Sequence, residues 1–172
     1  MISVIIPTLD DEAMLGRALH PLVPAAVAGL VREVIVADAG STDASLEIAD
    51  DAGCRILTGL PPGEGRARAA ASVASSDWLM ILDPSAQLLS GWESAVRGHI
   101  ERGRGQAAFI PIVDPRETSF SPRALAAWSK RLFGARRSIP VLLVERAAYV
   151  SADPTGPMRR LAACAVLLKE SG

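Results

Sequence analysis

The feature that most constrains the fold of this chain is a regular alternation of short apolar runs with helical segments in its first half. Four mostly apolar runs occupy residues 2–6, 33–37, 54–57 and 78–82. Continuous runs of this kind are typical of strands that are buried on both faces of a parallel sheet. Because helical patterns separate the runs, the sequence predicts a three-layer α/β/α sandwich around a mostly parallel sheet.

Three helices are expected between these strands. The first follows Asp10 and Asp11, which can cap a helix, and the other two cover residues 42–52 and 66–75. The last of these has a face of small side chains, which permits close packing onto a sheet. That face consists of Ala67, Ala70, Ala71 and Ala74.

The second half of the chain is less regular, but no linker or internal repeat divides it from the first. We therefore expect a single domain over residues 1–172. Strands are predicted at residues 106–113 and 141–145, and helices at residues 90–102, 122–133 and 158–169.

Composition narrows the classes of function. Of the 172 residues, 49% are hydrophobic and 22% charged, which is typical of a folded domain, and a net charge of −1 gives no reason to expect a nucleic-acid partner. The start of the chain lacks the pattern of a signal peptide, and no apolar stretch approaches the ~20 residues that span a bilayer. We expect a cytoplasmic protein in which Cys54 and Cys164 are free thiols.

Acidic residues follow three of the four predicted strands of the first half. Asp11 lies in an acidic triplet after the first strand, Asp38 follows the second, and Asp83 follows the strand at 78–82. Each acid by itself is an ordinary cap or turn residue. Ligands of open α/β sheets, however, bind beyond the carboxyl ends of the strands, so three acids at one edge predict a binding site there.

These segments together resemble family-2 glycosyltransferases. The resemblance rests on residues 3–12, on the Asp-x-Gly-Ser-Thr-Asp turn at 38–43, on residues 65–68 and on the strand at 78–83. It implies the glycosyltransferase-A type of fold and the transfer of a sugar from a nucleoside-diphosphate donor to an unknown hydroxyl acceptor. Residues 1–100 would form the nucleotide-binding half and residues 101–172 the acceptor-side half.

The resemblance also assigns nucleotide-binding roles to individual residues. Asp38 would accept a hydrogen bond from the base, and Asp83 would approach the ribose or a metal ion. A guanidinium near the nucleotide can satisfy phosphate or base oxygens. The full set is Pro7, Thr8, Leu9, Asp11, Asp38, Arg66 or Arg68, and Asp83.

The metal motif departs from the family pattern. The last position of the Asp-x-Asp motif is the usual ligand for Mg²⁺ or Mn²⁺, and here Asp83 is followed by Pro84 and Ser85. A neutral hydroxyl is a poorer ligand for a hard divalent ion than a carboxylate. Metal binding at Asp83 and Ser85 is therefore expected to be weak, or to need help from another group.

The general base and the acceptor side depart as well. Relatives usually carry a pair of acids ahead of the closing helix, whereas this chain has only Asp153, which either acts as the base or forms an ordinary turn before Pro154. Ser138, Ile139 and Pro140 stand where a short bacterial subgroup has Gly-Asp-Gln. The alternatives are a catalytically silent nucleotide-binding or scaffold domain and, less favoured because of the acidic first loop, a nucleotidyltransferase.

Residues 122–137 combine apolar side chains with five basic ones. Such a segment is either a helix packed on the sheet with a solvated basic face, which we favour, or a peripheral contact with the inner face of an anionic membrane.

Overall fold

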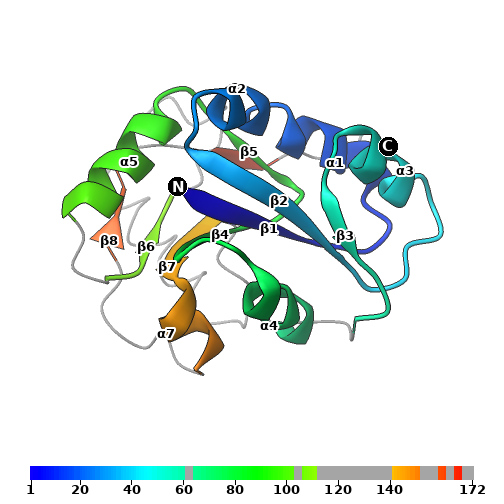
Figure 1. Cartoon of the computed structure of the whole chain (residues 1–172). Helices are drawn as coiled ribbons and strands as arrows, with labels where there is room; N and C mark the ends of the chain where they lie inside the picture. The colour runs from blue at the N-terminus through cyan, green and yellow to red at the C-terminus, as the bar shows by residue number, and fades with distance from the viewer. Residues whose placement is uncertain (61–63, 103–105, 112–140, 152–158, 162–164, 168–172) are drawn as a thin grey trace, which may run out of the picture.

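The structure is a computed structural model, and it describes residues 1–60, 64–102, 106–111, 141–151, 159–161 and 165–167. Within these residues, seven strands form one sheet that runs through the middle of the molecule (Figure 1). In spatial order they are β3 (Arg55–Leu57), β2 (Val31–Asp38), β1 (Ile2–Thr8), β4 (Trp78–Leu82), β7 (Val141–Glu145), β6 (Ala108–Phe109) and β8 (Arg159–Arg160).

The central strands of this sheet are parallel. β1 pairs in parallel with β2 on one side and with β4 on the other, and β2 pairs in parallel with β3. Only β7, among the described strands of this sheet, runs against its neighbours β4 and β6. The prediction of a mostly parallel sheet is confirmed.

Helices cover both faces of the sheet, which confirms the three layers (Figure 1). One layer contains α1 (Glu12–Leu19), α2 (Leu22–Val27), α3 (Ser45–Asp51) and α5 (Trp92–Arg102). The other contains α4 (Glu64–Val73) and α7 (Arg146–Val150). No helix in the described part of the chain is long and apolar enough to cross a membrane.

Alternation along β1 divides the core into two clusters. Val4 and Ile6 pack on the side of α1, whereas Ile5 packs on the side of α4, and all three are fully buried. Successive side chains of a strand point to opposite faces, so a strand buried on both faces needs apolar residues throughout. On the α4 side the predicted alanine face meets the sheet, with all four alanines buried.

The predicted closing helix at residues 158–169 is wrong. The described residues of this segment form β8, which pairs with β6, and β9 (Ala165–Leu167), which pairs with β5 (Ala86–Leu88) in a separate two-stranded sheet. Unpaired edges of β6 and β5 offered hydrogen-bond partners that helical periodicity could not reveal. Strands β5 and β9 and helix α7 were not predicted, and β6 is shorter than expected. The helix predicted at residues 122–133 lies outside the described residues.

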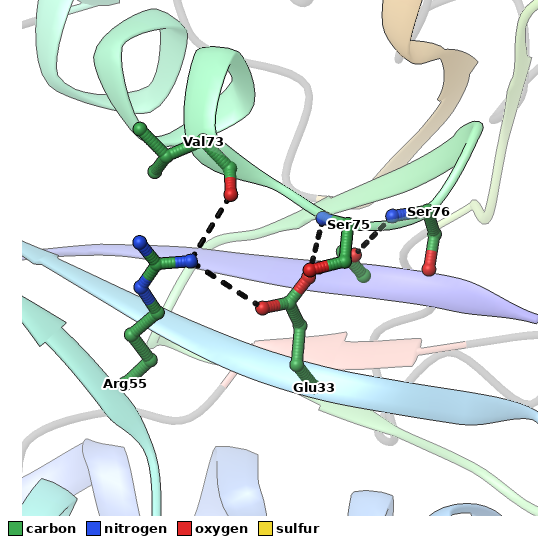
Figure 2. A network of polar contacts seen from close by, with 6 residues as sticks. Glu33, Arg55, Val73, Ser75 and Ser76 are labelled. Carbon is green, nitrogen blue, oxygen red and sulfur yellow. Dashed lines mark hydrogen bonds and ion pairs between the residues drawn. The ribbon is translucent and has the colours of Figure 1, made fainter.

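Glu33 on β2 anchors the amino-terminal edge of the sheet (Figure 2). Its Oε1 accepts hydrogen bonds from the Ser3 hydroxyl at 2.7 Å and from the Ser75 N–H at 2.6 Å, while its Oε2 lies 3.9 Å from Nη1 of Arg55. The same Arg55 nitrogen donates to the carbonyl of Val73 at 3.1 Å. One carboxylate thus joins β1, β2 and β3 to the segment between α4 and β4.

Charge on Glu33 therefore stabilises the fold. Burial alone would raise its pKa, but the Ser3 and Ser75 donors and the Arg55 charge outweigh this and hold the pKa of Glu33 below its ordinary value of 4.5. A lowered pKa means that the stabilisation is present above pH ~4.5 and is lost as the pH falls through the folded-state value.

We predict that Glu33→Ala lowers the free energy of unfolding at pH 7 by about 2 kcal/mol, because two donors lose a charged acceptor. Urea denaturation measures this, and the difference from the parent should shrink in acid. Glu47→Ala, on the exposed face of α3, is the control and should change the value by less than about 0.5 kcal/mol. Equal effects of the two substitutions would contradict the assignment.

Candidate functional site

The carboxyl ends of β1, β2 and β4 lie next to one another at one edge of the sheet. In the β1–β2 register Thr8 lies opposite Asp38, so the chain leaves both strands at the same level. β4 lies on the other side of β1 and also ends there, directly before Asp83. The loops that follow these three strands carry the predicted site residues.

Asp11 is the electrostatic centre of this edge. Burial raises the pKa of Asp11, and the negative charges of Asp83 and Asp43 raise it further. The N–H of Leu9, which donates to its Oδ2 at 2.9 Å, and the positive charge of Arg66 act in the opposite direction without cancelling the shift. The structure therefore places both Asp83 and Arg66 within range of the charge of Asp11.

Asp38 is 1% exposed and shapes the turn that follows β2. Its carboxylate accepts hydrogen bonds from the N–H of Gly40 at 2.7 Å, from the N–H of Ser41 and from the Ser41 hydroxyl. Gly40 has a φ of 104°, a conformation that side chains disfavour. The Asp-x-Gly-Ser order is thus what this turn requires, and a ligand that reached Asp38 would share its oxygens with the turn.

Arg66 and Arg68 are separated, although both are on α4. Nη1 of Arg66 donates to the carbonyl of Thr8 at 3.0 Å, and its buried Nε has no hydrogen-bond partner. The guanidinium of Arg68 instead lies 5.8 Å from the ring centre of Tyr149 on α7, a cation–π distance. Residues two apart on a helix face different directions. Of the two arginines, Arg66 therefore lies at the end of β1, whereas Arg68 lies beside α7.

Asp83 forms a tight turn with Ser85. Its Oδ1 accepts the N–H of Ser85 at 2.9 Å and the Ser85 hydroxyl at 2.5 Å. Ser85 thus orients the carboxylate through two hydrogen bonds to a single oxygen. Among the described residues, no group of three or more His, Cys, Asp or Glu side chains is arranged to hold a metal ion.

The remaining predicted residues differ in what they offer a ligand. Thr8 is fully buried, Pro7 is half-buried, and the side chain of Leu9 is exposed at the edge of the sheet. Asp153 lies outside the described residues, so its predicted role as base is not tested.

Side-chain oxygens accept the N–H groups of the residues that lead into α1. Four successive N–H groups, of residues 9–12, all donate to side-chain oxygens, two of which come from the loop between β2 and α3 and one from the first residue of α3. Sequence reasoning missed these acceptors, which are Ser41, Asp43 and Ser45. The Asp-x-Gly-Ser-Thr-Asp motif contains the first two, but only its first residue was assigned a role.

Comparison with known proteins identifies the family of this chain. The model for glycosyl transferase family 2 matches residues 3–147. Glucosyl-3-phosphoglycerate synthase of Mycolicibacterium paratuberculosis is 42% identical over a segment that covers 38% of this chain and 22% of that protein.

Solved structures of a related enzyme are similar to this chain. Glucosyl-3-phosphoglycerate synthase from Mycobacterium tuberculosis, in complex with Mn²⁺, uridine diphosphate and glucosyl-3-phosphoglycerate, superposes with a TM-score of 0.61 at 26% identity. The same enzyme with Mn²⁺, UDP-glucose and phosphoglyceric acid gives a TM-score of 0.60 at 26% identity. Each comparison covers 86% of this chain and 57% of the other, so the chain spans little more than half the length of these relatives.

The family match covers most of the chain, and the solved relatives have the same fold. The three-layer fold is therefore of the glycosyltransferase-A type, and the chain belongs to glycosyl transferase family 2.

Proposed function

We propose that this protein is a glycosyltransferase that moves a sugar from a uridine-diphosphate donor to a hydroxyl acceptor. The observation that carries the proposal is that Asp11 and Asp83 follow neighbouring strands at one edge of the sheet, where Arg66 donates to the carbonyl of Thr8. Ligands of open α/β sheets bind at this edge. Solved relatives of the same family bind uridine diphosphate or UDP-glucose with Mn²⁺.

The donor's diphosphate needs positive charge beside it. A helix amino terminus binds phosphate through free N–H groups, and at the start of α1 the N–H groups of Asp11 and Glu12 already donate to side chains. Arg66 is the cation that acts on Asp11 from α4, and its guanidinium retains donors beyond the bond to Thr8. We assign Arg66 to the nucleotide and Asp38 to the base, with Leu9 beside it.

Asp83 and Ser85 fit a divalent ion to which the protein contributes few ligands. Mg²⁺ in particular binds through one or two carboxylates, completed by substrate phosphates and water. Asp83 supplies one such carboxylate, and Ser85 directs two hydrogen bonds to a single oxygen of it. Such an ion would offset the charge of the departing diphosphate.

Transfer to an alcohol needs a base that removes the hydroxyl proton as the oxygen attacks the anomeric carbon, and we assign this role to Asp153. The first hundred residues would then hold the donor and residues 101–172 the acceptor. Contact of residues 122–137 with a membrane stays a prediction, since that segment lies outside the described residues.

Calorimetric titration with uridine diphosphate, with and without Mn²⁺, tests donor binding. We predict that Asp38→Ala abolishes binding, because the turn loses its buried acceptor, and that Asp83→Ala weakens binding about tenfold. Asp50→Ala, on the exposed face of α3, is the charge-matched control. Parent-like binding by both site variants would refute the site. Binding by the parent without hydrolysis or transfer of any UDP-sugar would identify a silent domain.

Ser85→Asp restores the family's usual metal ligand. We predict that this change increases the stimulation of nucleotide binding by Mn²⁺ about tenfold, because a second carboxylate completes the ion's ligands. The ratio of dissociation constants without and with Mn²⁺ measures the effect. An unchanged ratio would show that the ion does not bind beside Asp83 and Ser85.

Asp11→Asn should separate stability from binding. The raised pKa of Asp11 means that charging it costs stability in the folded state, a cost that is absent at low pH and appears as the pH rises through the folded value. The amide oxygen can still accept the N–H of Leu9. We predict a slightly higher melting temperature at pH 7 together with weaker nucleotide binding, measured by calorimetry. A lower melting temperature would contradict the electrostatic assignment.

A further inference from the structure

Two segments exchange hydrogen bonds in both directions. The first loop comprises residues 9–12, which run from the end of β1 to the first residue of α1. The second loop comprises residues 39–45, which run from the end of β2 to the first residue of α3. Main-chain N–H groups of the first loop donate to side chains of the second. The donors are Asp10, which bonds to the Ser41 hydroxyl, Asp11, which bonds to the Ser45 hydroxyl, and Glu12, which bonds to Oδ2 of Asp43, each at 2.9 Å.

Main-chain N–H groups of the second loop donate back to side chains of the first. Oδ1 of Asp10 accepts from the N–H of Thr42 at 2.7 Å and from its hydroxyl at 3.3 Å. Oε2 of Glu12 accepts from the N–H of Ala44 at 2.9 Å. Glu12 and the segment 43–44 are therefore joined by a reciprocal pair of bonds, like a capping box that spans two loops.

The conformation of Asp10 suits this exchange. Among the described residues, Asp10 is the one non-glycine residue with a positive φ, at 52°. Such a backbone costs energy and persists only where surrounding contacts hold it. Here the bonds of Asp10 to Ser41 and Thr42 provide those contacts. Because Ser41 also donates to Asp38, the first loop is connected to this buried carboxylate.

We propose that Asp10, Glu12 and Asp43 are positioning residues that clamp these two loops together, so that Asp11 and Asp38 hold their places before the nucleotide arrives. The carboxylates of the clamp are used as acceptors for main-chain N–H groups and do not bind the donor or a cation. This role rests on the proposed function. Most of the clamp bonds are exposed to solvent, so they act on loop geometry more than on global stability.

Glu12 offers a sharp test, because an amide can replace its carboxylate as an acceptor. Glu12→Gln keeps an oxygen for the N–H of Ala44 and should bind uridine diphosphate within about twofold of the parent. Glu12→Ala loses the acceptor and should bind about tenfold more weakly, with a melting temperature close to the parent's. Equal losses in the two variants would show that the charge itself matters and would overturn the proposal, as would a loss of stability that accounts for the weaker binding.

Asp10 provides a second pair that does not depend on Glu12. Asn tolerates a positive φ and keeps an acceptor, so Asp10→Asn should bind like the parent. Glycine permits the same φ without strain but has no side-chain acceptor. Asp10→Gly should therefore bind more weakly because the bonds to Thr42 are lost, and not because the backbone is strained. Parent-like binding by Asp10→Gly would overturn the proposal.

Hydrogen exchange in the nucleotide-free protein separates this proposal from the proposed function. The N–H groups of Thr42 and Ala44 should be protected in the parent, and their exchange should accelerate in Asp10→Gly and Glu12→Ala respectively. Unchanged exchange would refute the clamp, even if nucleotide binds. Protected N–H groups in a parent that binds no nucleotide would uphold the clamp, while refuting both the proposed function and the positioning role.

Discussion

Main-chain pairing of β1 with β2 on one side and β4 on the other determines where every polar group of the candidate site lies. The three strands are parallel neighbours, so their carboxyl ends share one edge of the sheet. A shift of one residue in β1 would exchange Ile5 with Val4 or Ile6 between the two core clusters. Because both faces are buried, the register is fixed, and with it the position of Thr8 beside Asp38.

At that edge Asp11 lies within range of other charges, although its partial burial disfavours its charged form. Asp11 is partly desolvated and close to two other carboxylates, and Arg66 offsets only part of the cost. Structural ion pairs normally lower the pKa of an acid, as the surroundings of Glu33 do at the opposite edge. The contrast between the two edges is a physical reason to place the function at Asp11 and the structural anchor at Glu33.

The amino terminus of α1 is bonded to the segment that follows β2. The N–H groups of residues 10–12 are bonded to hydroxyls and a carboxylate of residues 41–45, which joins the start of this helix to the chain after β2. Under the proposed function, Arg66 and a cation near Asp83 would offset the charge of the diphosphate. With Ser85 in place of a second carboxylate, such a cation would depend more on the nucleotide's own oxygens.

The sequence by itself determined the order of strands and helices in the first half of the chain, the three layers and the edge that carries the acids. It could do so because apolar runs, turn residues and the alanine face of α4 are local signals. Only the tertiary structure decided that Arg66 and not Arg68 acts on the charge of Asp11, that Asp43 accepts the N–H of Glu12, and that residues 159–160 and 165–167 are strands. These outcomes depend on partners distant in the sequence, and a local pattern contains no information about which distant backbone will supply the missing hydrogen bond.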